Sequence, residues 1–201
     1  MNAQTSFEYL CEKAKSLDVV AVSSLVLDDP RFILWSGSSK PFQHHYGKGG
    51  LVIHTAEVVQ LCLLNNNMLS SSIENPIINE RQLFLAALYH DIGKCWDYEP
   101  TNPDYSEWKG THHKRHIHHI SRSSLVWQQA ATQTLDPTNR SDFAFIESYR
   151  DEILHAILAH HGLREWGSPV LPNTRLAWML HLCDGISARM NDAEKWDHVN
   201  K

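Results

Sequence analysis

Long apolar runs are missing from this sequence of 201 residues. No segment approaches the roughly 18 consecutive apolar residues that a membrane-spanning helix needs. The first residues, Met1 to Thr5, also lack the basic-then-apolar pattern of a secretory signal. We therefore expect a cytoplasmic protein that makes no membrane contact. The length suits one compact domain around a single core.

Grouped cysteines and a surplus of positive charge are also absent. The four cysteines lie far apart and form no CxxC pair, which indicates neither a zinc knuckle nor a disulfide framework: Cys11, Cys62, Cys95 and Cys183. The formal net charge is -5, which argues against a strongly basic protein that binds nucleic acid irrespective of its sequence. A local basic groove remains open.

Strand signals are lacking as well, and the apolar residues follow helical spacing. The predicted helices cover 6–17, 51–64, 80–90, 113–134 and 142–161, and a last one follows the expected N-cap Asn173. Glycine- or proline-rich connections are expected over 36–50 and 96–110. The sequence predicts an all-α single domain over 1–201, with a core of about 42–191 and an N-terminal helical extension over 1–41.

Histidine, in contrast, is abundant, with 14 residues among 201. Metal binding is one reason for such usage. The adjacent pair His90-Asp91 ends an apolar helix just before Gly93. Its imidazole and carboxylate could grip one metal ion, and the second carboxylate oxygen could reach another.

Six residues on five successive predicted helices could build one buried site, as metal sites in helical bundles do: His54, His90, Asp91, His119, His160 and Asp184. For any one of them a structural role stays open, such as a core histidine bonded to a carbonyl group. Together they predict two metal ions that share Asp91. The first would be held by His54, His90, Asp91 and Asp184, and the second by Asp91, His119 and His160. Such ligands suit Mn, Fe, Co, Ni or Zn.

With these residues placed, the chain resembles the HD-domain superfamily in its six-ligand form, over about residues 42–191. The segment HHYGKGGLVIHT at 44–55 looks like the start of the HD domain in bacterial YhaM-type 3′-to-5′ exoribonucleases and in some conjugative relaxases. His119-Ile120-Ser121 resembles the GHIS element of those exoribonucleases, with His118 in place of the glycine. His160-His161-Gly162, followed by Gly167-Ser168-Pro169, resembles their HHG…GSP element.

This resemblance implies an HD-domain helical bundle with a buried dinuclear metal site, and metal-dependent cleavage of phosphate esters. The substrate would be a phosphate-containing small molecule or a single-stranded nucleic-acid end. Two departures concern the substrate. The sequence has no room for the OB fold that precedes the HD domain in the exoribonucleases, and Leu163-Arg164-Glu165-Trp166 stands where cyclic-di-GMP phosphodiesterases carry their GYP signature.

A metal-bridging hydroxide would then attack phosphorus, so no protein nucleophile is needed. Lys94 could meet a phosphate oxygen, or be an exposed lysine at a helix end. His161 could replace His160 as a ligand, or protonate the leaving oxygen if its pKa lies near neutrality. His45 could bind phosphate or carry protons, or only order its loop.

Further candidates lie around these residues. Arg122 could clamp a phosphate or be a surface residue. His118, with the histidines and basic residues of 112–116, could steer a phosphate-rich substrate or form a solvated helix start. Trp108 and Trp166 could stack on a base or serve packing.

Two other function classes stay open. Some HD proteins use the same six ligands around a mixed-valent di-iron pair as oxygenases, which would consume oxygen with an organophosphonate or polyol substrate. The chain could also be a non-catalytic HD binding module with a vestigial metal site.

Overall fold

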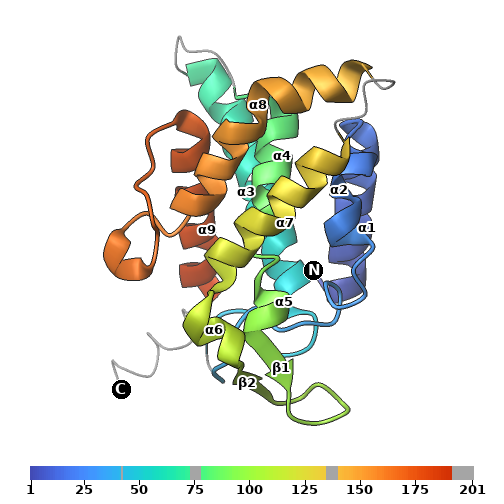
Figure 1. The fold of residues 1–201 in the computed structure, drawn as a ribbon, viewed down its shortest axis with the longest axis vertical. Helices are drawn as coiled ribbons and strands as arrows, with labels where there is room; N and C mark the ends of the chain where they lie inside the picture. Colours follow the sequence, from blue (N-terminus) through green and yellow to red (C-terminus); the bar gives the residue numbers. More distant parts are fainter. Residues whose placement is uncertain (42, 73–77, 135–139, 192–201) are drawn as a thin grey trace.

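Helices form the body of the molecule in the computed structural model, which describes residues 1–41, 43–72, 78–134 and 140–191 (Figure 1). Phe42, the first residue of the expected core, lies outside these ranges. In chain order the elements are α1 (Ala3–Ser16), α2 (Val20–Leu27), α3 (Gly50–Ser72), α4 (Glu80–Tyr89), α5 (Lys94–Asp97), β1 (Tyr98–Pro100), β2 (Trp108–Gly110), α6 (His112–His116), α7 (His119–Thr134), α8 (Arg140–Ala159), the 3-10 turn η1 (Arg164–Trp166) and α9 (Arg175–Asn191). The expected helical bundle is confirmed.

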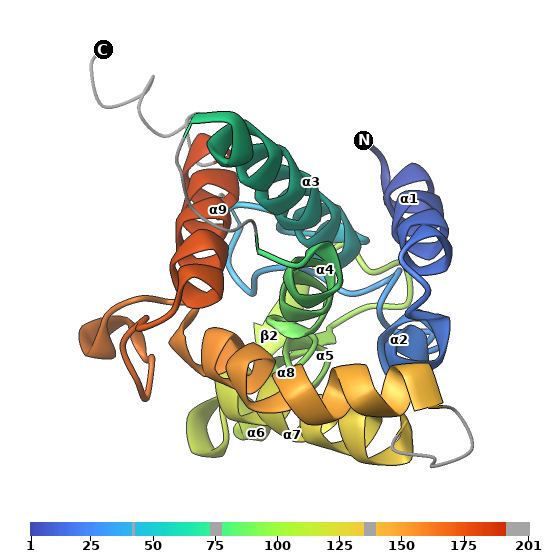
Figure 2. The ribbon, with the colours of Figure 1, turned by 90° about the horizontal axis from the view of Figure 1, so that it is seen from above.

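Helix α4 lies at the centre of the bundle, with α3, α9, α8 and α2 around it (Figure 2). Every residue from 82 to 89 is buried. A helix that is apolar on nearly all sides is typical of such a position. The Asn79 side chain caps its start by accepting a hydrogen bond from the Arg81 amide at 2.9 Å. His90 and Asp91 directly follow Tyr89, the last residue of α4, and are buried with it.

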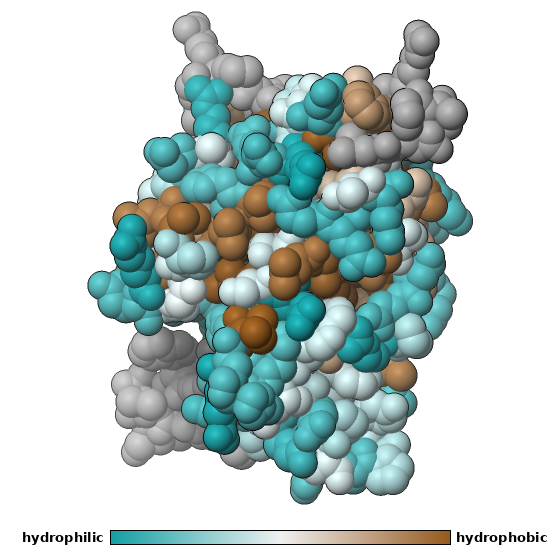
Figure 3. Space-filling model, in the orientation of Figure 1, coloured by the Kyte–Doolittle hydropathy of each residue, from teal (hydrophilic) through white to brown (hydrophobic). Residues whose placement is uncertain are grey.

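The N-terminal helices share the same core. Leu10 of α1 and Val22 and Val26 of α2 belong to one buried cluster with the central helices. Hydrophobic residues reach the surface in a band across α7 and α8, while the end that carries α6 and the β-hairpin is mainly hydrophilic (Figure 3). Within the described residues, no helix has both the length and the apolar character to cross a membrane.

A short β-hairpin lies within the connection over 96–110, a segment whose residues carry no strand signal. Strand β1 pairs antiparallel with β2, so that Tyr98 faces Gly110 and Pro100 faces Trp108. Trp108 packs edge-on against Trp35, with ring centroids 5.4 Å apart. Strands of three residues are too short to show alternation, so tertiary contacts decide this element.

The helix predicted over 113–134 is two helices, α6 and α7. The helix is interrupted at His118, which has a φ of 68°, in the left-handed region. The break is stabilised by Asp97, whose Oδ2 accepts the His119 amide at 3.0 Å. It therefore makes His119 the first residue of α7.

Two helix ends also differ from the prediction. Helix α3 continues to Ser72 instead of ending at Leu64, because the Asn66 side chain bonds to the Ile78 backbone, at 2.9 and 3.1 Å, and does not cap the helix. At α9 the capping side chain is that of Thr174, one residue after Asn173. Its hydroxyl accepts the Ala177 amide at 3.1 Å.

Gly93 provides a test of this packing, because its α-carbon faces the start of α7. A Cβ at Gly93 would lie 2.2 Å from the His119 carbonyl oxygen. We expect Gly93→Ala to lower the free energy of unfolding by about 1–3 kcal/mol, the usual effect of overpacking, and so to lower the Tm by several degrees.

Gly185→Ala is the matched control, since a Cβ at this position in α9 meets nothing within 4 Å. Alanine there should raise helix stability slightly. Thermal denaturation measures both variants. A Gly93→Ala protein as stable as the unmodified chain would contradict the close approach of the turn after α4 to α7.

Candidate metal centre

All six predicted ligands meet at one place in the bundle. His54 comes from the first turns of α3, His90 and Asp91 follow α4, and His119 begins α7. His160 directly follows α8, and Asp184 lies in the middle of α9. Asp91 is only 2% exposed, and the four histidines are buried around it. Each ligand thus comes from a helix or helix end that the core holds in place.

The two oxygens of Asp91 face two different groups of side chains. Oδ2 lies 3.3 Å from His54 Nε2 and 3.4 Å from His90 Nε2. On this side Asp184 Oδ1 is 3.1 Å from the same nitrogen of His54. Oδ1 points the other way and lies 3.5 Å from His119 Nε2 and 3.6 Å from His160 Nε2. This is the arrangement of a carboxylate that bridges two cation positions.

Hydrogen bonds fix the ring tautomers in the first group. His90 Nδ1 lies 2.7 Å from the Ala87 carbonyl oxygen, which only accepts, so Nδ1 carries the proton. His54 Nδ1 lies 3.0 Å from Ser187 Oγ, whose own hydrogen is donated to Glu57 at 2.9 Å. Both Nε2 atoms then present lone pairs to each other at 3.2 Å. Two facing lone pairs are stable only with a cation or a proton between them.

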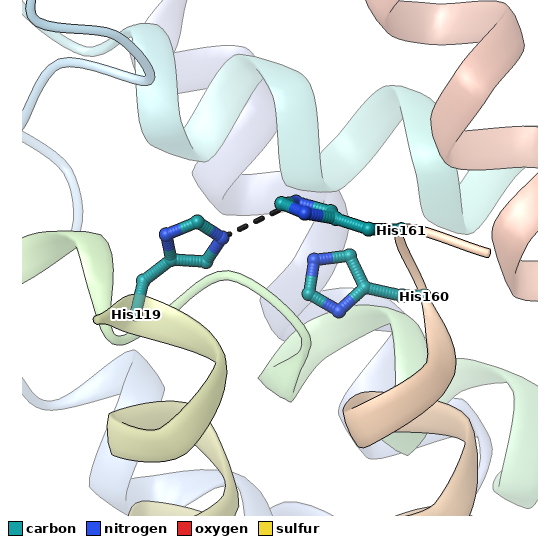
Figure 4. Close-up of side chains that lie close together, drawn as sticks. All are labelled: His119, His160 and His161. Carbon is teal, nitrogen blue, oxygen red and sulfur yellow. Dashed lines mark hydrogen bonds between the residues drawn. The ribbon is translucent and has the colours of Figure 1, made fainter. Parts of the chain in front are cut away.

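The second group repeats this arrangement. His119 Nδ1 donates to Asp97 Oδ2 at 3.1 Å, and His161 Nδ1 donates to the Trp166 carbonyl oxygen at 2.6 Å. Their Nε2 atoms face each other at 3.3 Å, with His160 beside them (Figure 4). His160 Nδ1 donates to the Ile157 carbonyl oxygen at 2.7 Å.

Two buried atoms at the centre have no hydrogen-bond partner among the described residues. They are Asp91 Oδ1 and His160 Nε2, which face each other as two acceptors. A buried polar group without a partner destabilises a fold. The donor atoms of His54, His90 and Asp91 lie within 4.8 Å of one another, as do those of His119, His160 and His161. These residues fit two transition-metal ions, which imidazole and carboxylate ligands bind well.

The electrostatics agree with a site for positive charge. Burial disfavours a charged carboxylate, but the Lys94 ammonium and His90 hold the pKa of Asp91 well below its usual range. Burial also disfavours a charged His54, yet hydrogen bonds with Asp184 and Asp91 raise its pKa to about 8. The carboxylates that attract a proton to this ring would equally attract a metal ion.

The second group of histidines binds protons less readily than His54 does. Burial lowers the pKa of His119 to about 4, against the opposing bond with Asp97. Burial, followed by the neighbouring His160 and His119, lowers the pKa of His161 to about 3. At neutral pH both rings are therefore neutral and can act as ligands.

Lys94 is buried at the centre rather than exposed at a helix end. It is 6% exposed, and its Nζ lies 2.6 Å from Asp91 Oδ2. Burial opposes its charge, but the Asp91 carboxylate raises the pKa of Lys94 above its ordinary value. A permanent positive charge thus lies beside the proposed bridging carboxylate.

A cavity of about 340 Å³ connects this centre to the surface. Its lining includes the predicted residues Lys94, His119, His160, His161 and Asp184, together with His44, Trp166 and Arg189. His45 contacts Glu57, with His45 Nε2 3.0 Å from Glu57 Oε2. Since Glu57 also accepts the Ser187 hydroxyl, His45 is linked to the hydrogen-bonded support of His54.

The structure does not bring Arg122 to this cavity. Its Nε donates to His113 Nε2 at 3.0 Å, and its guanidinium lies 5.2 Å from the centroid of the Trp96 ring. His113 Nδ1 in turn donates to Asp97 Oδ1 at 2.7 Å. Arg122 therefore supports His119 through two intermediate residues. A role as phosphate clamp does not fit this position.

His118 lies next to the centre, with its ring 4.1 Å from that of His119 and 6.2 Å from that of His161. The rings of His112 and His116, in contrast, stack on each other at the surface, with centroids 3.6 Å apart. The four histidines of this segment thus separate into His118 beside the centre, His113 bonded to Asp97, and the exposed pair His112 and His116.

Sequence reasoning missed the side chains that support the ligands, above all Asp97. Its Oδ2 accepts both the amide and the ring of His119, while its Oδ1 accepts from His113. A carboxylate on the outer nitrogen of a ligating histidine is a common support of metal sites. Asp97 lies on α5 and not on the helix of His119, so helical spacing does not connect the two residues. Its position six residues after Asp91 was the one available signal.

Comparisons with known proteins identify the family of this chain. The family model of the HD domain matches residues 51–189. The chain is 30% identical over 151 residues to the 3′-5′ exoribonuclease YhaM of Shouchella clausii (strain KSM-K16). This alignment covers 74% of the chain and 40% of that protein. It is 27% identical over 152 residues to the YhaM exoribonuclease of Bacillus subtilis (strain 168), covering 74% and 41%.

The chain thus spans about two fifths of the length of these curated relatives. No solved structure matches it. The family match confirms the resemblance drawn from the histidine and aspartate motifs.

Asp97→Asn tests the support of His119. The amide keeps the shape of the side chain but removes the charge that holds the His119 ring. We expect the affinity for one of two metal ions to fall about 10- to 100-fold, as for other supporting residues of metal sites. Titration against a chelator of known affinity measures this.

Asp104→Asn is the control, since Asp104 is an exposed carboxylate in the hairpin connection. It should leave both affinities unchanged. If Asp97→Asn bound both ions as tightly as the unmodified chain, His119 would not depend on Asp97.

Proposed function

Because this chain belongs to the HD-domain family, we propose that it is a metal-dependent phosphohydrolase or phosphodiesterase that cleaves phosphate esters of a nucleotide or a nucleic-acid end. One observation carries the proposal: Asp91 presents one oxygen to each of two groups of histidines. The names of the relatives, both 3′-5′ exoribonucleases, support the choice of substrate.

The six ligands would hold two divalent transition-metal ions. His54, His90 and Asp184 would hold one, His119 and His160 the other, and Asp91 both. Two such ions supply a hydroxide nucleophile at neutral pH and stabilise the charge that develops on the phosphoryl oxygens. The protein's part is to keep each Nε2 lone pair aimed inward, which the Nδ1 hydrogen bonds accomplish.

Lys94 is the proposed phosphate-binding residue. Its ammonium lines the cavity beside Asp91, so it can donate to a phosphoryl oxygen of a substrate that reaches the centre. Its charge would favour a substrate that is negative at the reacting group.

His161 is better suited to donate a lone pair than a proton. Its Nδ1 hydrogen is held by the Trp166 carbonyl oxygen, so its Nε2 faces the second group of ligands without a proton. We propose that it adds to His160 rather than replacing it. His45 acts through Glu57 and Ser187 on His54 and is a positioning residue in this scheme.

The test is a panel of nucleotides, cyclic dinucleotides and short single-stranded RNAs, incubated with protein reconstituted with Mn, Fe, Co, Ni or Zn. We expect release of phosphate or of nucleoside monophosphates without oxygen consumption, with the products identified by mass. Cleavage of none of these substrates would contradict the proposal. Oxygen consumption with an organophosphonate or polyol would identify a di-iron oxygenase instead.

Asp91→Ala tests the shared ligand. We expect this variant to lose both metal ions and at least 100-fold in hydrolysis, the order of effect for losing a metal-ion catalyst. His119→Ala should empty mainly the second position and leave about one ion per chain. Elemental analysis of the purified variants measures both, with Asp104→Ala as the control. Full metal content in Asp91→Ala would show that Asp91 does not bridge.

A further inference from the structure

The structure separates the two tryptophans that flank the metal centre. Trp108 is 5% exposed and packs against Trp35 inside the hairpin region, so no ligand can stack on it. Trp166 is 50% exposed and lines the same cavity as the metal-binding histidines. A large aromatic side chain that is half exposed within a cavity is a typical feature of a binding site.

The backbone of Trp166 is fixed to the metal centre even though its ring is exposed. Its carbonyl oxygen accepts from His161 Nδ1 at 2.6 Å. Its ring centroid lies 6.4 Å from that of His181, whose Nδ1 donates to the His160 carbonyl oxygen at 2.8 Å. The position of the ring relative to the metal ligands is therefore set by the protein, as precise stacking on a substrate requires.

A positive charge lies over one face of this ring. The guanidinium of Arg189, on α9, is 5.5 Å from the centroid of the Trp166 ring and also lines the cavity. Arg189 is exposed and follows Asp184 by five residues on the same helix. The cavity thus offers an aromatic face and a phosphate-binding cation next to the metal ligands.

We propose that Trp166 and Arg189 form a nucleotide subsite in which the base next to the cleaved phosphate stacks on Trp166 and Arg189 binds a neighbouring phosphate. This inference rests on the proposed function and narrows its substrate to an unpaired nucleotide at the end of a single strand. A base inside a duplex is already stacked on both faces, whereas an unpaired terminal base offers one to the tryptophan. The cavity of about 340 Å³ lies within the usual volume range of small-ligand sites and suits one nucleotide.

Trp178 provides a matched control. It is also 50% exposed, but it lies on α9 in an apolar groove with Met179 and Leu182 and does not line the cavity of the metal ligands. Like Trp166 it packs against the His181 ring, with centroids 5.9 Å apart, so removing it deletes an equally exposed tryptophan and the same kind of His181 contact without removing an aromatic face from the cavity.

The experiment compares two short single-stranded RNAs, one with a normal nucleotide and one with an abasic nucleotide at the cleaved end. We expect Trp166→Ala to raise KM about tenfold for the normal RNA, within the range for loss of one base–aromatic stack. It should leave KM for the abasic RNA unchanged. Trp166→Phe should keep most of the affinity, and Trp178→Ala should match the unmodified chain on both RNAs.

Arg189→Ala should weaken binding of both RNAs to the same extent, because it contacts phosphate and not base, and should reduce the salt dependence of KM. Elemental analysis of Trp166→Ala should give the metal content of the unmodified chain. An equal loss on normal and abasic RNA, or loss of metal, would make Trp166 a support of His161 and overturn the subsite. If the unmodified chain cleaved neither RNA nor any nucleotide, the proposed function itself would fail.

Discussion

The Asp91 carboxylate is buried at the centre of the bundle, and its two oxygens face opposite groups of histidines. A charge in this position is stable only if other charges meet it, and Lys94 and the His54 ring meet one oxygen. The other oxygen faces acceptors. Much of the architecture follows from this constraint, because α3, α4, α7, α8 and α9 each direct a ligand toward the same carboxylate.

A second layer of groups, from side chains and backbone, holds the predicted ligands in their orientations. Backbone carbonyl groups orient His90 and His160, Asp97 orients His119, and Ser187 with Glu57 orients His54. This layer also connects the centre to its surroundings. His113 and Arg122 connect to Asp97 and so to His119. The loop that carries His45 connects through Glu57 to His54.

The convergence of the six predicted ligands could be expected from the sequence because each lies in or directly after a helix, within a recognisable motif. Asp97, Ser187 and Glu57 could not, since their roles arise from tertiary contacts between elements that are distant in sequence. The break at His118 was missed for a related reason. A left-handed histidine interrupts a good helical pattern only because Asp97 stabilises the new start of α7. Burial of Lys94 likewise depends on the fold and not on its sequence position.

In the proposed centre one carboxylate, that of Asp91, holds two metal ions. X-ray absorption spectroscopy of the metal-loaded chain tests this bridge, because it reports the neighbours of the metal itself. A metal–metal distance of roughly 3.5–4 Å, with imidazole nitrogens in the first coordination sphere, is the expected result for a two-metal site. A spectrum of isolated ions, with imidazole ligands but without a metal neighbour at that distance at full loading, would contradict it.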